Sequence, residues 1–144
     1  MEQKTFEQLK SLRKLPDDEA AVWIMAQFPL GSSWIPAMTY IRHLSWRKPT
    51  RKLLFEYYFA HQRWGNKNIY TAFLSIMPVR EFIGLFEANV SVDKPYNEFL
   101  QYYLELVLTG MLTNDDCVWH PKTGEGDQTL IRTFLKRLPS LLWT

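Results

Sequence analysis

The sequence is poor in the residues that mark several classes of protein. Its 144 residues include one cysteine, Cys117, which excludes an internal disulfide framework and fits a reducing compartment. Six glycines and eight prolines are too few for a collagen-like or low-complexity chain. No apolar run approaches the roughly 18 residues of a membrane span, and residues 1–5 have no apolar segment behind their charges. We therefore expect a cytoplasmic protein without a secretion signal or a membrane partner.

Motifs of catalysis and cofactor binding are absent as well. The chain has no G-x-x-x-x-G-K phosphate loop, no G-x-G-x-x-G dinucleotide fingerprint and no G-x-S-x-G nucleophile elbow. Cys117 and His120 have the C-x-x-H spacing of half a zinc site, but structural zinc takes four ligands and the chain has no second cysteine. We predict no catalytic residue, no cofactor and no bound metal.

Histidines in the basic part of the chain suggest one enzymatic alternative. His43 and His61 would perform general acid–base cleavage of RNA if the fold brought them together. At 100° per residue, however, His61 falls on the apolar face of its predicted helix, where a neutral core histidine is the commoner outcome. A small hydrolase or nuclease that uses His43, His61 or His120 is therefore our third hypothesis.

The chain does contain a helical pattern along almost its whole length. Its 47% hydrophobic and 22% charged residues are typical of a globular protein, and 144 residues suffice for one core. Apolar residues recur at helical spacing between prolines, and no segment alternates with a period of two. We predict a single all-α domain over residues 1–144. The expected helices cover about residues 6–15, 17–28, 33–46, 51–64, 68–77, 78–90, 93–109 and 127–138.

Eight short helices joined by tight turns predict an antiparallel array or bundle, with a stack of helix pairs as the alternative. The spacing from Pro16 to Pro49 is near the length of one helix pair. No residue pattern that we find repeats at that period, so a named repeat family is not supported. The sequence leaves the choice between a bundle and stacked pairs open.

Two helices can be analysed by the angle between their residues. In the helix over 51–64, Leu53, His61 and Trp64 fall on the apolar face, whereas Phe59 falls in the polar stripe. This placement makes Phe59 a candidate for contact with a partner. The helix over 93–109 has only a narrow polar stripe, which predicts a central, mostly buried helix with a packing role.

The net charge is only +2, but the charges are segregated along the chain. Residues 42–67 contain seven basic residues and one acid, a net charge of +6, and residues 101–127 contain five acids and one base, a net charge of −4. Such a chain presents two opposite fields. The predicted basic surface for partner binding consists of Arg47, Lys48, Arg51, Lys52, Trp46, Phe59 and Arg63. The predicted acidic surface consists of Asp115, Asp116, Glu125 and Asp127.

Arg51 and Lys52 have a notable position. Both fall in the first turn of their predicted helix, where the positive end of the helix dipole disfavours cations by about 0.3–1 kcal/mol each. Lys52 also precedes Glu56 by four residues, which is the weaker order for a helical ion pair. Local stability therefore does not explain these two cations, and we interpret them as part of a surface for an anionic partner.

These observations favour a non-enzymatic interaction protein. Trp, Tyr and Arg dominate the energetics of protein interfaces, and aromatic residues make up 15% of this chain. Our first hypothesis is a small inhibitor, antitoxin or toxin-immunity protein whose partner is another protein, such as a toxin or an enzyme. The alternative is a nucleic-acid-binding helical domain that uses the basic surface. The oligomeric state is not predicted.

The prediction that no metal is needed can be tested by removing metal. Incubation with a chelator should leave the melting temperature unchanged, because Cys117 and His120 lack enough further ligands for a structural zinc. The measurement is a pair of thermal melts together with elemental analysis. Stoichiometric zinc in the purified protein would contradict the prediction.

Overall fold

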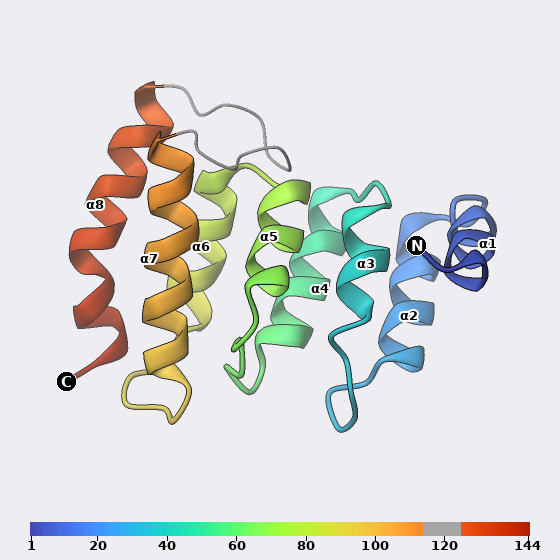
Figure 1. The fold of residues 1–144 in the computed structure, drawn as a ribbon, viewed down its shortest axis with the longest axis horizontal. Helices are drawn as coiled ribbons and strands as arrows, with labels where there is room; N and C mark the ends of the chain where they lie inside the picture. Colours follow the sequence, from blue (N-terminus) through green and yellow to red (C-terminus); the bar gives the residue numbers. More distant parts are fainter. Residues whose placement is uncertain (114–124) are drawn as a thin grey trace.

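The computed structural model describes residues 1–113 and 125–144, and within these ranges helices joined by turns and loops are the only regular secondary structure (Figure 1). The all-α prediction is therefore confirmed for this part of the chain. No described helix is long and apolar enough to cross a membrane. The helices are α1 (Gln3–Leu12), α2 (Asp17–Gln27), α3 (Ala37–Arg42), α4 (Lys48–Phe59), α5 (Lys67–Ile76), α6 (Val79–Asn89), α7 (Asn97–Thr113) and α8 (Glu125–Leu142).

The helices form two rows that run along the long axis of the molecule (Figure 1). Helices α2, α4, α6 and α8 pack side by side in one row, and α3, α5 and α7 pack in the other. From α2 to α6, each helix thus contacts the helix two places further along the chain, and antiparallel pairs such as α7 and α8 join the rows. Of the two arrangements that the sequence left open, the structure has stacked helix pairs.

A repeat of 31 residues underlies this stack. Helices α2, α4 and α6 begin at residues 17, 48 and 79. The positions Ile24, Phe55 and Phe86 are separated by the same interval, and all three side chains are fully buried. Sequence inspection missed the repeat because only the apolar character recurs at these positions, not the residue type.

The third helix is shorter than predicted at both ends. The residues before Ala37 form a turn instead of a helix, and the backbone N–H of Ala37 donates to the Trp34 carbonyl. At the other end, the Trp46 indole N–H donates to the Ile41 carbonyl at 2.8 Å. That carbonyl belongs to the last turn of α3, where no further helical N–H would satisfy it. The helix therefore ends at Arg42 instead of near Trp46.

The predicted orientation of the fourth helix is wrong. Phe59 is 2% exposed, whereas Leu53, placed on the buried face, is 48% exposed. Helix α4 ends at Phe59, so the residues after Phe59 do not follow the 100° spacing from which the buried face was predicted. His61 is consequently exposed, not in the core. Trp64 is fully buried after the chain has turned back, and its indole N–H donates to the Tyr58 carbonyl at 2.9 Å.

The turn after α4 is formed at Gln62. Gln62 has φ of 54°, in the left-handed region, and is 5% exposed. Its amide explains this conformation, because the nitrogen donates to the Ser91 carbonyl at 2.9 Å and to Asn97 Oδ1 at 2.7 Å. Its oxygen accepts from the Ser91 backbone N–H at 2.7 Å. One side chain thus joins the α4–α5 turn to the α6–α7 turn.

Asn97 extends this polar network to the end of α8. The side chain is fully buried, and its nitrogen donates to the Ser91 carbonyl at 3.0 Å and to the Leu142 carbonyl at 2.9 Å. Buried amides need such partners, because an unsatisfied buried polar group costs about 1–3 kcal/mol. Three connections of the stack therefore meet at one amide pair.

Substitution of Asn97 should reveal the strength of this network. Asn97→Ala removes three hydrogen bonds and leaves buried partners unsatisfied, so we expect the free energy of unfolding to fall by about 3 kcal/mol. The matched control is Asn68→Ala, which changes an exposed asparagine in α5 and should cost less than about 0.5 kcal/mol. Urea unfolding measures both. Equal losses for the two variants would contradict the assigned role of the network.

Candidate protein interface on helix α7

Two aromatic residues of the predicted basic surface are part of the core. Trp46 is 8% exposed and its indole N–H is bonded within the fold; Phe59 is 2% exposed and stacks on Phe55. Neither side chain can reach a partner, so their assignment to a binding surface is wrong. The physical reason is that each covers apolar neighbours that the linear pattern does not reveal.

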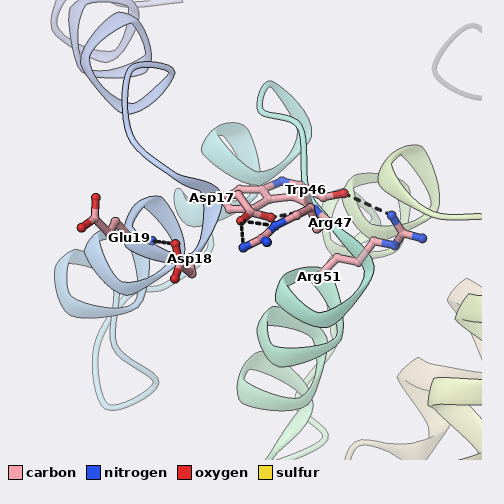
Figure 2. Close-up of polar contacts among 6 residues, drawn as sticks. All are labelled: Asp17, Asp18, Glu19, Trp46, Arg47 and Arg51. Atoms are coloured by element: carbon pink, nitrogen blue, oxygen red, sulfur yellow. Dashed lines mark hydrogen bonds and ion pairs between the residues drawn. The ribbon is translucent and has the colours of Figure 1, made fainter.

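Arg47 is held by an acid from the preceding helix pair (Figure 2). Its backbone N–H donates to Asp17 Oδ2 at 2.7 Å, and its Nε donates to Asp17 Oδ1 at 2.9 Å. Burial acts to raise the pKa of Asp17, but the hydrogen bonds from Arg47 outweigh burial and lower that pKa. The carboxylate also lies at the N-terminus of α4, where negative charge is favourable. Arg47 itself stays 71% exposed.

Arg51 has a structural explanation that its local sequence does not show. Its guanidinium forms a bidentate ion pair with Glu81 of α6: Nε donates to Oε2 at 2.6 Å and Nη2 donates to Oε1 at 2.7 Å. Its Nη1 donates to the Trp46 carbonyl at 3.1 Å. The side chains of Arg51 and Glu81 are only 18% and 13% exposed. The interpretation of Arg51 as a cation kept for an anionic partner is therefore wrong, because a paired arginine offers little free charge.

The remaining members of the two predicted surfaces have different outcomes. Lys48 and Lys52 are exposed and form no ion pair with any described residue. Arg63 is exposed beside helix α7. On the acidic surface, Asp127 is half-buried in the first turn of α8, and Glu125 begins that helix. Asp115 and Asp116 lie outside the described residues. The two surfaces therefore retain fewer available charges among the described residues than the sequence suggested.

The structure does not bring the candidate histidines together. His43 follows α3 and His61 follows α4, so the twelve residues of α4 lie between them. At 1.5 Å per residue the helix alone spans about 18 Å, too far for the two rings to act on one bond. His120 and Cys117 lie outside the described residues. Among the residues that the structure describes, no three His, Cys, Asp or Glu side chains form a group suited to a metal ion.

Helix α7, which the sequence predicts to be mostly buried, exposes large apolar side chains on one face. Phe99 is 47% exposed, Tyr102 60% and Leu106 46%, and Tyr96, just before the helix, is 38% exposed. At 100° per residue the three helical members lie within about 60° of one another. We call these four side chains the aromatic stripe. The prediction of a mostly buried helix is wrong for this face and holds for the opposite face. That face buries Leu100, Leu104, Val107, Leu108 and Met111.

The turn after α4 supports one end of the aromatic stripe. The guanidinium carbon of Arg63 lies 5.9 Å from the centroid of the Tyr96 ring, a cation–π distance. Gly65 packs below the rings, because a Cβ at this position would lie 3.8 Å from Phe99 and 3.9 Å from Tyr96. The stripe is thus backed by a turn that the core holds in place.

The middle of the stripe is continuous with the core. Tyr102 meets Tyr103 edge to face with ring centroids 5.0 Å apart, and Tyr103 stacks on Tyr70 of α5 at 5.7 Å. Tyr70 is fully buried, and its hydroxyl donates to the Trp64 carbonyl at 2.6 Å. The exposed rings are therefore supported by buried aromatic residues, which restricts their conformational freedom.

The composition of this face is that of a protein interface. Exposed aromatic residues and an arginine are the side chains most enriched at the centres of such interfaces. Contiguous exposed apolar side chains on a folded protein mark interaction sites, whereas single ones need no explanation.

Comparison of the chain with known protein families, with curated proteins and with solved structures finds no match.

Substitution of Arg51 and Lys52 tests whether a paired cation contributes more to stability than an exposed, unpaired one. Arg51→Ala leaves the half-buried Glu81 without its partner, so we expect the free energy of unfolding to fall by about 2 kcal/mol. Lys52→Ala removes an exposed cation and should change it by less than about 0.5 kcal/mol. Chemical denaturation of the two variants is the measurement. An equal and small effect of both would mean that the pair with Glu81 is not structural.

Proposed function

We propose that this protein is a non-enzymatic interaction module that binds a protein partner through the aromatic stripe on α7. The observation that carries the proposal is the exposure of four large apolar side chains, between 38% and 60% each, on one face at the end of the helix stack. Burial of such side chains against a partner gains about 25 cal/mol for each Å² of apolar surface. Association of the stripe with a partner would therefore be favourable.

The charges near the stripe favour a protein over a nucleic acid. Glu98 and Glu105 are exposed on the same helix, beside the aromatic residues, and would repel phosphates. Arg47 and Arg51, which the nucleic-acid hypothesis needs, are engaged with Asp17 and Glu81. A protein partner with charges of both signs suits a face that has Arg63 at one side and glutamates at the other.

Within this class, an inhibitor-type role in the cytoplasm is our specific proposal. Inhibitors, antitoxins and immunity proteins act by occupying a surface of another protein, and they need rigid contact residues but no chemistry of their own. The stripe meets the first requirement through Tyr103 and Tyr70, which connect it to the core. A toxin or another enzyme is the kind of partner that such a protein would block.

The experiment compares two double variants that each truncate two exposed apolar side chains to alanine. Phe99→Ala with Tyr102→Ala removes the centre of the stripe, whereas Val22→Ala with Leu53→Ala removes two exposed apolar side chains from α2 and α4. The wild type is used to capture partners from lysate treated with nuclease, and the purified partner is then titrated with each variant. We expect the stripe variant to bind roughly a hundredfold more weakly, as for the loss of two interface hot spots, and the control variant to bind normally.

Other outcomes would contradict the proposal. Normal binding by the stripe variant, with thermal melts showing both variants folded, would place the interface elsewhere. Loss of the captured partner on nuclease treatment would favour the nucleic-acid hypothesis. Weakening by Lys48→Ala with Lys52→Ala alone would assign binding to the remaining free cations of the predicted basic surface.

A further inference from the structure

Residues of α1, α2 and α3 and of the segments that flank these helices line a cleft. These three helices lie at the opposite end of the stack from α7 (Figure 1). The volume of the cleft is about 740 Å³, within the range of small-molecule sites. The side chains that matter for its chemistry are Trp23, Phe28, Tyr40, Gln8, Gln27 and Thr39. The cleft shares no residue with the aromatic stripe, so a ligand bound in it would be independent of the proposed function.

Three aromatic rings form one wall of the cleft. Trp23 and Tyr40 have ring centroids 5.5 Å apart, Phe28 and Tyr40 are also 5.5 Å apart, and Trp23 meets Phe28 edge to face at 6.4 Å. The rings fix one another, while Trp23 and Phe28 remain only half-buried. A preformed, partly open aromatic wall is suited to stacking against a flat ring.

The hydroxyl of Tyr40 has no hydrogen-bond partner among the described residues, although the side chain is 7% exposed. Other buried tyrosines of this protein are satisfied: Tyr58 donates to the Phe28 carbonyl at 3.0 Å, and Tyr70 donates to the Trp64 carbonyl at 2.6 Å. Tyr40 lines the cleft, so its hydroxyl is available for a hydrogen bond with solvent or with a ligand bound there.

Other polar groups of the lining are at least partly exposed and also have no partner among the described residues. The side-chain amides of Gln8 and Gln27, the hydroxyl of Thr39 and the indole N–H of Trp23 form no hydrogen bond with a described residue. An amide side chain offers a donor and an acceptor side by side, the pattern that pairs with the edge of an adenine ring. The cleft therefore combines a stacking wall with unused donors and acceptors.

The polar lining of the cleft is mainly uncharged. His43 lines the cleft, and burial together with Arg42 and Arg13 lowers the pKa of this histidine, which favours the neutral form of its ring. The charged residues Glu2 and Lys4 line the cleft from α1 and its N-cap, and their charges oppose each other. A neutral ligand that forms hydrogen bonds suits this lining better than an ion.

We propose that this cleft binds a flat, uncharged heteroaromatic ring with hydrogen-bonding edges, of the nucleobase class. The ring stacks on the wall formed by Trp23, Phe28 and Tyr40. Its edge takes the hydrogen bonds that Tyr40, Gln8 and Gln27 leave unused. Free nucleosides and single-stranded nucleic acid both carry this chemistry, and stacking of a base on an aromatic side chain contributes about 1–3 kcal/mol.

The experiment titrates adenosine into the full chain by calorimetry and by NMR. We expect saturable binding of one molecule. Trp23→Leu should weaken it roughly tenfold or more through loss of stacking. The matched control is Trp143→Leu, a partly exposed tryptophan at the far end of the stack, which should bind adenosine normally. A titration with a short adenosine oligonucleotide distinguishes the two sources: tighter, salt-sensitive binding identifies single-stranded nucleic acid, and equal binding identifies the nucleoside.

Tyr40→Phe separates ligand binding from folding. Because the hydroxyl has no partner among the described residues, its removal should leave the melting temperature unchanged or raise it, while adenosine binding weakens about fivefold. Tyr102→Phe, an exposed tyrosine of α7, is the control and should change neither quantity. Absence of saturable adenosine binding at millimolar concentration would overturn the proposal. Binding of methyl glucoside in place of adenosine would overturn it too, because it would assign the cleft to sugars.

Discussion

Burial of Trp64 is the constraint on which much of the architecture depends. Its indole N–H bonds the Tyr58 carbonyl, its own carbonyl accepts from Tyr70, and its ring packs on those of Phe55 and Phe73. The chain can satisfy these contacts only if α4 stops early and turns back on itself. That reversal brings Gln62 to the α6–α7 connection and sets Arg63 and Gly65 beside the exposed rings of α7. The core and the candidate interface therefore share one cause.

The parts of the fold that could be predicted are those encoded locally. Prolines at helix starts and the spacing of apolar residues indicate eight helices and an all-α class, because both act within a few residues. The orientation of α7 could not be predicted in this way. Its apolar residues lie on nearly all sides of the helix, so their angular positions do not show which face packs on other helices and which remains exposed. That choice depends on α5 and α8, which pack on one side of it.

The pairing of charged side chains was the least predictable property, because the two members of each pair lie about one repeat apart in the sequence. Asp17 is 30 residues from Arg47, and Arg51 is 30 residues from Glu81. Each pair joins one helix to the equivalent helix of the next pair, so a run of cations that resembles a binding surface in the sequence is partly neutralised in space. Knowledge of the 31-residue period would have predicted both pairs, but the period itself appears only as recurring burial at positions such as Phe55 and Phe86.

The same period determines how the chain can fold. Many of the polar bonds that join different helix pairs connect residues about 30 positions apart, including Arg13 with His43 and Tyr58 with Phe28. Closure of a loop of this length costs little entropy. Once one helix pair has formed, the next pair can pack on it by closing another loop of similar length. Assembly can thus advance one helix pair at a time from any starting pair, as in a one-dimensional lattice with nearest-neighbour coupling. Loss of an end pair would then unravel the chain locally, while the remaining pairs keep their order.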